Sequence, residues 1–201
     1  MFKVVNHAEK VPLTIDDLGA IVRGRANLVH FNEFKNIHSI DQLFNDVSAV
    51  IIFSAVESSN VGHYSTMLWH QSTNTLELFD SFGFDPEHVY SNAVYEQTRG
   101  PNYLNMFIKT VVNNERVNFV FNSRRLQSEA MDSNECGRYA AVRVRFHFLS
   151  LQQFMLCFNS TRGVTPDAIV TMMTMLFTEN DDSLKKLFSN AILNTKYTIE
   201  P

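Results

Sequence analysis

The chain has 201 residues, of which 45% are hydrophobic and 19% charged, and its net charge is −4 at pH 7. This length fits one domain, residues 1–201, with a continuous core, and the acidic balance gives no bulk reason to bind nucleic acid. No apolar run reaches the ~20 residues of a membrane-spanning helix, and the first residues lack the apolar centre of a signal peptide. We therefore expect an intracellular protein that does not act at a membrane.

The first half of the chain predicts short helices followed by strands. A helix is expected at 13–22, with Thr14 as its N-cap, and another at 39–46. Residues 47–56 form a β-branched apolar run, which is typical of a strand buried on both faces. Segments 63–71 and 75–82 alternate in polarity around a short polar turn and therefore predict a β-hairpin.

The second half is mainly helical by its hydrophobic pattern. Helices are predicted at 85–97, 102–113, 165–178 and 182–193, and a strand at 117–127. Residues 137–157 carry an apolar stripe at helical spacing, which predicts one long buried helix. The order of elements predicts an α+β fold, with a central mixed or antiparallel sheet flanked by helices. Residues 158–201 are expected to form a helical C-terminal extension that packs on the rest of the chain.

Two basic clusters interrupt this pattern, "RRL" at 124–126 and "RVRF" at 143–146. In an acidic chain, such short clusters are interpreted as solvated faces or as partners of carboxylates. They are too short to predict a track for phosphates.

Cys136 stands where a polar loop, "MDSNE", runs into an apolar segment. If Cys136 begins a buried helix, the unpaired N–H groups and the helix dipole there stabilise a thiolate. The alternative is a small hydrophobic residue that starts a helix. Cys157, between Leu156 and Phe158, has the surroundings of a core cysteine. Both cysteines are expected to be reduced, because two residues cannot form a disulfide framework.

A catalytic thiol needs a base, and the best placed of seven histidines is His63. It follows Gly62 at the start of a predicted strand, where its ring can face a cleft. Asp80 ends the partner strand, and a carboxylate that accepts Nδ1–H would hold the imidazole in position. Each residue alone also has a structural explanation, since histidines pack in folds and aspartates cap turns at strand ends.

Gln127 is the candidate for stabilising an oxyanion. It ends a predicted strand before the Cys136 loop, and its amide could donate a hydrogen bond to developing negative charge. A surface glutamine is the alternative. Asn122, or main-chain N–H groups in residues 129–135, could serve instead.

Two stretches, "NVGHYSTMLWHQSTNTLELFDSFGF" and "LQSEAMDSNECGRYAA", resemble the adenovirus-protease (adenain) type of cysteine peptidase. That family shares its core fold with the proteases that remove SUMO and ubiquitin-like proteins. Its pattern is Gly-His plus an aromatic residue, an acidic residue before xFGF, a Gln, and a Ser/Asn-containing loop ending in Cys-Gly. The resemblance covers about residues 45–157 and implies that they form a papain-like cysteine protease core, with the nucleophile at the N-terminus of a buried helix.

Carried over by position, the resemblance implies that Cys136 is the nucleophile, His63 its base and Asp80 the orienting acid. Gln127 and the backbone N–H of Cys136 would form the oxyanion hole. The chain departs from the family at three points. Tyr64 stands where a Trp is usual, Asp80 replaces the adenoviral Glu, and Gln127 lies further from the cysteine.

The resemblance also implies a function, which is that of a maturation protease from a virophage or a related small DNA virus. Its expected partners are capsid and virion precursor proteins as substrates, and its expected location is the virion and the viral factory in the host-cell cytoplasm. The alternatives are an isopeptidase that acts on ubiquitin-like modifiers and a catalytically silent binding module.

No cofactor is expected. The adenoviral enzyme is activated by DNA and a disulfide-linked peptide, but no second cysteine lies between His63 and Cys136, and the chain is acidic. A peptide or DNA activator is therefore only weakly supported. The histidines show no HxxxH spacing and no close Cys/His quartet, so no metal site is expected either.

Overall fold

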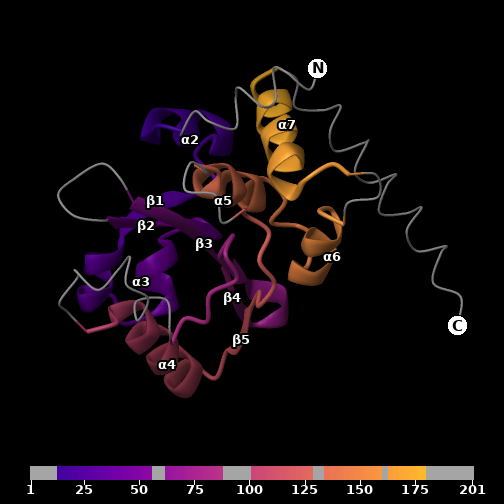
Figure 1. Cartoon of the computed structure of the whole chain (residues 1–201). Coiled ribbons are helices and arrows are strands. Elements are labelled where there is room, and N and C mark those ends of the chain that lie inside the picture. Colours follow the sequence, from indigo (N-terminus) through magenta and orange to yellow (C-terminus); the bar gives the residue numbers. More distant parts are fainter. Residues whose placement is uncertain (1–12, 56–61, 88–100, 129–133, 160–162, 180–201) are drawn as a thin grey trace, which may run out of the picture.

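A computed structural model describes residues 13–55, 62–87, 101–128, 134–159 and 163–179. Within them, a five-stranded sheet has the order β1-β2-β3-β4-β5 (Figure 1). The pairs β1–β2 and β4–β5 are parallel, and the pairs β2–β3 and β3–β4 are antiparallel. The strands are β1 (Asn27–His30), β2 (Ala49–Ala55), β3 (Gly62–His70), β4 (Thr75–Phe79) and β5 (Asn118–Phe121). The predicted α+β fold with a central mixed sheet is confirmed.

Helices cover both faces of this sheet (Figure 1). They are α2 (Ile15–Val22), α3 (Ile40–Phe44), α4 (Tyr103–Glu115), α5 (Cys136–Arg145), α6 (Leu151–Leu156) and α7 (Pro166–Glu179), with short 3-10 helices η1 (Phe31–Asn36) and η2 (Gln71–Thr73). One core cluster joins α2, α5 and α7 to the sheet, and a second joins η1, α3 and α4 to the opposite face. Strand β2 gives Ile51 to the first cluster and Ile52 to the second, which explains why it is apolar on both sides, as predicted.

The single helix predicted over 137–157 is wrong, because α5 ends at Arg145. The side chain of Arg143 is fully buried, and its guanidinium donates to the carbonyl oxygens of Phe146 (2.7 Å) and Leu149 (2.9 Å). These bonds hold the segment after α5 in a turn, in which the Phe146 carbonyl oxygen also accepts from the Leu149 N–H (2.9 Å).

Helix α6 then starts anew with its own cap. The Ser150 hydroxyl accepts from the Gln153 N–H and the Gln153 side chain accepts from the Ser150 N–H, which forms a capping box. Phe148, an apolar residue within the helix predicted over 137–157, falls in the turn and is 53% exposed. The apolar spacing continues across the break, so the pattern alone predicts one helix where the structure has two.

Most other elements lie within about two residues of their predicted positions. Thr14 caps α2 in a capping box with Asp17, and α4 and α7 correspond to the helices predicted at 102–113 and 165–178. Strand β1 and η1 were missed, since four residues on a parallel edge leave little pattern. The helices predicted at 85–97 and 182–193 fall mainly or wholly outside the described residues.

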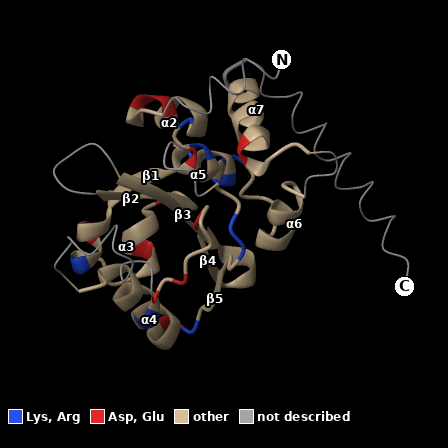
Figure 2. Cartoon of the chain, in the orientation of Figure 1, with Lys and Arg blue, Asp and Glu red and all other residues tan. Residues whose placement is uncertain are grey.

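The two arginine clusters lie on α5 and on the segment that follows β5 (Figure 2). In the first, Arg143 pairs with a buried carboxylate and Arg145 lies over the Phe177 ring, 4.9 Å from its centroid. In the second, Arg124 donates to Asn159 (2.5 Å). Arg143 and Arg145 are therefore packed into the fold, and Arg143 is the partner of a carboxylate.

Candidate active site

His63 and Asp80 meet at one end of the β3–β4 hairpin. His63 is the second residue of β3 and Asp80 directly follows β4, so antiparallel pairing brings them to the same end. Nε2 of His63 lies 2.6 Å from Oδ2 of Asp80, and both side chains are buried. The carboxylate thus contacts Nε2 and not Nδ1, the nitrogen that triad logic suggested.

The Cys136 thiol is the third member of this group. Cys136 is the first residue of α5 and is half-buried, and its side chain hydrogen bonds to His63. Because Asp80 holds Nε2, Nδ1 is the ring nitrogen that remains for the thiol. Helix α5 packs against β3, so its N-terminus, whose N–H groups and dipole favour a thiolate, lies beside the histidine.

The surroundings keep the His63 ring protonated. Burial lowers the pKa of His63, but the charge of Asp80, its hydrogen bond and the bond to Cys136 together outweigh burial and raise the pKa to about 10. The ring is therefore an imidazolium at neutral pH. Such a cation supports a thiolate nucleophile and can give its proton to a leaving group.

Tyr64 provides the aromatic residue of the family pattern. Its ring packs on Phe53, with centroids 4.9 Å apart. Burial and the negative charge of Cys136 raise the pKa of Tyr64. The phenol ring therefore lies near the thiol, at the position where the resembled pattern usually has a Trp.

Phe82 supports the histidine and the aspartate together, a role that sequence reasoning missed. Its ring packs against that of His63 at a centroid distance of 5.2 Å, and the Arg125 guanidinium lies over its ring at 5.0 Å. Its N–H donates to Oδ1 of Asp80 (2.8 Å). The signal in the sequence was its place in "DSFGF", two residues after the acidic residue.

Asn122 holds the backbone of Asp80 and is not available as an oxyanion donor. Its Oδ1 accepts from the Asp80 N–H (2.8 Å), and its Nδ2 donates to the carbonyl oxygens of Asp80 (2.6 Å) and Arg124 (3.1 Å). Both amide hydrogens are used by the backbone. This side chain also replaces ladder bonds, so β5 ends at Phe121, well short of the strand predicted over 117–127.

The turn after β4 requires a glycine at position 83. The Gly83 N–H donates to the Asp80 carbonyl oxygen (2.9 Å), and Gly83 has a φ of +67°. A Cβ at Gly83 would lie 2.7 Å from the carbonyl carbon of Arg124. This tight turn keeps the acidic residue and the two that follow it in one place.

Gln127 is buried, at 2% exposure, and is not a surface glutamine. The Ser81 hydroxyl donates to its Oε1 (2.7 Å), and the Ser81 carbonyl oxygen accepts from the N–H groups of Leu126 (2.9 Å) and Gln127 (3.0 Å). Because Ser81 holds the amide oxygen, the donating –NH₂ group points away from Ser81. Ser81 directly follows Asp80, so one turn holds the amide and the carboxylate.

A second pair of a histidine with a carboxylate, His70 and Glu77, lies at the other end of β3 and contributes to packing. Nε2 of His70 lies 3.0 Å from Oε2 of Glu77, and Arg143 donates to both Glu77 oxygens, at 2.6 and 2.8 Å. Burial raises the pKa of Glu77, but the bonds from His70 and Arg143 outweigh it and lower the pKa. The bidentate pair fastens α5 to β4.

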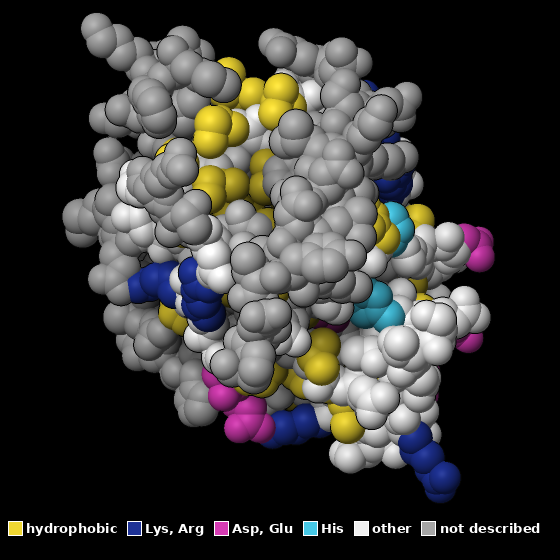
Figure 3. Space-filling view, turned by 90° about the vertical axis from the view of Figure 1, so that its right-hand side faces the viewer, with side chains coloured by type: hydrophobic (Ala, Val, Ile, Leu, Met, Phe, Trp, Pro, Cys, Tyr) yellow, Lys and Arg dark blue, Asp and Glu magenta, His cyan; other side chains and the backbone are white. Residues whose placement is uncertain are grey.

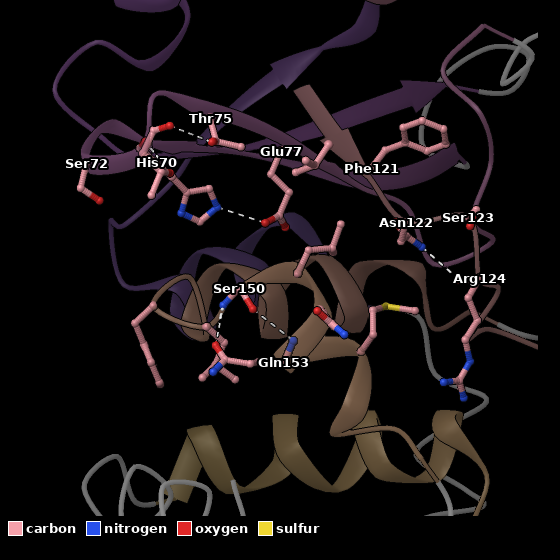
Figure 4. A pocket seen from close by; sticks show the side chains of 17 residues that line it. His70, Ser72, Thr75, Glu77, Phe121, Asn122, Ser123, Arg124, Ser150 and Gln153 are labelled. Atoms are coloured by element: carbon pink, nitrogen blue, oxygen red, sulfur yellow. Dashed lines mark hydrogen bonds and ion pairs between the residues drawn. The ribbon is translucent and has the colours of Figure 1, made fainter. Parts of the chain in front are cut away.

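A hollow of about 850 Å³ lies beside this pair, between the β4–β5 side of the sheet and α6. Figure 4 shows His70 and Glu77 on its sheet side and Ser150 and Gln153 on its helix side. Figure 3 shows the face of the molecule that lies on the right in Figure 1, and hydrophobic and histidine side chains are visible on it. None of the four predicted catalytic residues lines the hollow. The hollow is therefore separate from the group formed by Cys136, His63 and Asp80.

Two further searches cover only the described part of the chain. No helix there is long and apolar enough to cross a membrane. No group of three or more His, Cys, Asp or Glu side chains there could hold a metal ion.

Comparisons with known proteins support the fold. No family model matches the chain. It is 25% identical over 179 residues to an uncharacterized protein of Sputnik virophage, covering 86% of this chain and 99% of that protein. It superposes on the crystal structure of an ASFV protease with a TM-score of 0.50 and 13% identity, covering 84% of this chain and 68% of that one. The crystal structure of the C-terminal Ulp1 protease domain in complex with Smt3, the yeast orthologue of SUMO, superposes with a TM-score of 0.40 and 13% identity. The superposition covers 84% of this chain and 77% of that one. The chain thus shares its α+β fold with the ASFV protease.

Proposed function

We propose that this chain is a cysteine endopeptidase in which Cys136 is the nucleophile. The observation that carries the proposal is the line of three side chains, in which the thiol at the start of α5 bonds to His63 and His63 bonds to buried Asp80. A histidine held protonated beside a thiol at a helix N-terminus is the arrangement that activates a cysteine.

The first half of the reaction forms a thioester. The Cys136 sulfur attacks the carbonyl carbon of the scissile peptide bond, and the oxyanion accepts hydrogen bonds from the Cys136 N–H and the Gln127 amide. His63 gives its proton to the leaving amine as the C–N bond breaks. Asp80 keeps the ring oriented throughout.

The second half releases the enzyme. His63, now neutral, takes a proton from water, and the hydroxide attacks the thioester carbonyl. The C–S bond breaks, the acid product leaves and the thiolate–imidazolium pair returns. These side chains supply every proton transfer, so the reaction requires no cofactor.

The biological role that fits best is the cleavage of capsid and virion precursors during particle maturation, in the virion and the host-cell cytoplasm. Three observations support it: the resemblance of the two motif stretches to adenain, the similar protein in Sputnik virophage, and the fold shared with the ASFV protease. By the same resemblance, the substrate lies extended, with small residues such as Gly before the cut.

The test combines cleavage with alkylation of the thiol. The full chain should cleave the capsid precursor encoded alongside it, and iodoacetamide should alkylate Cys136 over about pH 4 to 9 with a rate that depends on His63. Cys136→Ala should abolish cleavage, and His63→Ala should abolish cleavage and slow alkylation at low pH. Cys157→Ala is the matched control, because burial raises the pKa of that thiol.

Three outcomes would redirect the proposal. Cleavage of a ubiquitin-like modifier fusion without cleavage of the precursor would point to an isopeptidase. Alkylation that is indifferent to His63, with no cleavage of either substrate, would point to a binding module. Activity that appears only after a virion peptide or DNA is added would reveal an activator.

A further inference from the structure

Helix α7 presents a row of polar side chains to the interior. Asp167, Thr171 and Thr174 follow the i, i+4, i+7 spacing that lines one face of a helix. Thr171 is fully buried and Thr174 is 2% exposed. A hydroxyl that leaves water without a hydrogen bond is costly, so such a buried row needs specific partners.

Those partners lie on the two segments that carry the proposed oxyanion donors. Asp167 accepts from the backbone N–H of Ser128 (3.1 Å) through Oδ2 and from the Tyr139 hydroxyl (2.8 Å) through Oδ1. Thr171 donates to Oε2 of Glu135 (3.0 Å). Ser128 directly follows Gln127, and Glu135 directly precedes Cys136.

A second link ties the first turn of α5 to the same helix. Oε2 of Glu135 pairs with Nε of Arg138 (3.0 Å), and Nη1 of Arg138 donates to the Thr174 hydroxyl (3.1 Å). Glu135 occupies the N-cap position of α5, yet its side chain makes no capping bond to that helix. Its carboxylate bonds instead to Thr171 on α7 and to the side chain of Arg138, so it does not cap the N–H groups of the first turn.

We propose that α7 is a clamp that positions the oxyanion hole, with Asp167 and Thr171 as its positioning residues; this rests on the proposed peptidase function. Asp167 fixes the chain next to Gln127, and Thr171 fixes the chain next to Cys136. The two donors come from segments that are separate in sequence, and one rigid helix sets the distance between them. Stabilising an oxyanion depends on such fixed placement, and a shift of about 1 Å can cost about 100-fold in rate.

The decisive variant is Thr171→Val, which keeps the shape of the side chain and removes its hydroxyl. We expect kcat for a peptide substrate to fall about 10-fold with KM nearly unchanged, and Asp167→Asn to act in the same direction. Inhibition by a peptide aldehyde, whose adduct carries an oxyanion, should weaken to a similar extent. Alkylation of Cys136 by iodoacetamide builds no oxyanion, so its rate should stay within about twofold.

Two controls separate positioning from a loss of stability. Thr171→Ser keeps the hydroxyl and should restore kcat. Thr110→Val makes the same change on α4, where the hydroxyl donates to Met106 O (2.8 Å), on the opposite face of the sheet. It should leave kcat unchanged even if it lowers the melting temperature.

The clamp can fail independently of the peptidase proposal. If Thr171→Val lowers the melting temperature but keeps wild-type kcat and aldehyde inhibition, α7 only stabilises the fold and the clamp is overturned. If the wild type cleaves no substrate, the clamp is tested by the rate of hydrogen exchange of the backbone amides in residues 134–139. Faster exchange in Thr171→Val than in Thr110→Val supports the clamp, and equal exchange overturns it.

Discussion

Replacing Asp80 by Asn removes the charge that keeps His63 protonated and changes little else in shape. The amide can still contact Nε2 of the ring, and Phe82 still packs on the ring's face. Burial of His63 remains and lowers its pKa, while the largest opposing contribution, the charge of Asp80, is lost. We therefore expect the imidazole of this variant to be neutral at physiological pH.

The size of the effect follows from the pKa of His63. A pKa of about 10 against the ordinary 6.5 corresponds to about 5 kcal/mol in favour of the protonated ring in the folded protein. Without the imidazolium, the thiolate loses its counterion and the leaving amine loses its acid. A positioned acid contributes about 10²- to 10⁴-fold, so kcat/KM at neutral pH should fall by at least about 100-fold.

The assay is a pH profile of kcat/KM for wild type and Asp80→Asn, with Asp41→Asn, an exposed carboxylate on α3, as the control. In the wild type, activity should persist until the pH passes about 10. In Asp80→Asn the alkaline limb should move to about pH 6.5 or below. Asp41→Asn should follow the wild type throughout.

Urea unfolding provides a second measurement of the same quantity. A pKa raised in the folded state stabilises the fold fully below pH 6.5, the ordinary value, and this stabilisation is lost as the pH rises to about 10. The free energy of unfolding of the wild type should therefore fall by about 1.4 kcal/mol per pH unit across that window. Asp80→Asn should lack this fall. An unchanged alkaline limb, or a rate within about threefold of the wild type, would refute the reasoning.

Three further substitutions test the surroundings of the site. Ser81→Ala should lower kcat about 10-fold by releasing the Gln127 amide; in a Gln127→Ala background it should add no further loss, and an additive loss would contradict this role. Gly83→Ala should destabilise the fold by at least about 2 kcal/mol in urea, because its φ of +67° and the close backbone resist a Cβ; a smaller loss would show that the turn relaxes. Glu77→Gln should cost about 3–5 kcal/mol in thermal unfolding by leaving Arg143 buried without its counter-charge; a neutral result would mean that water reaches the guanidinium.

Local patterns accounted for much of the fold. The hairpin that carries His63 and Asp80 was predictable because its strands alternate in polarity and only a short turn separates them. The cap of α2 at Thr14 was visible for the same reason, since the capping box spans four residues. The break between α5 and α6 was not, because Arg143 finds its carboxylate on β4, far away in the sequence.

By itself, the sequence determined which chemistry was possible: a cysteine at a loop–helix junction, preceded in order by a histidine, an aspartate and a glutamine. Only the tertiary structure decided how these groups are used. In the structure, Nε2 of His63 contacts Asp80, and both amide hydrogens of Asn122 bond to backbone carbonyl oxygens. The Gln127 oxygen accepts from Ser81, and α7 bonds to both segments of the site. The physical reason is that a hydrogen bond forms only when donor and acceptor lie within a few tenths of an ångström of about 3 Å, and here these groups are far apart along the chain. Such distances are set by how helices and sheet pack, and residue spacing along the chain does not encode them.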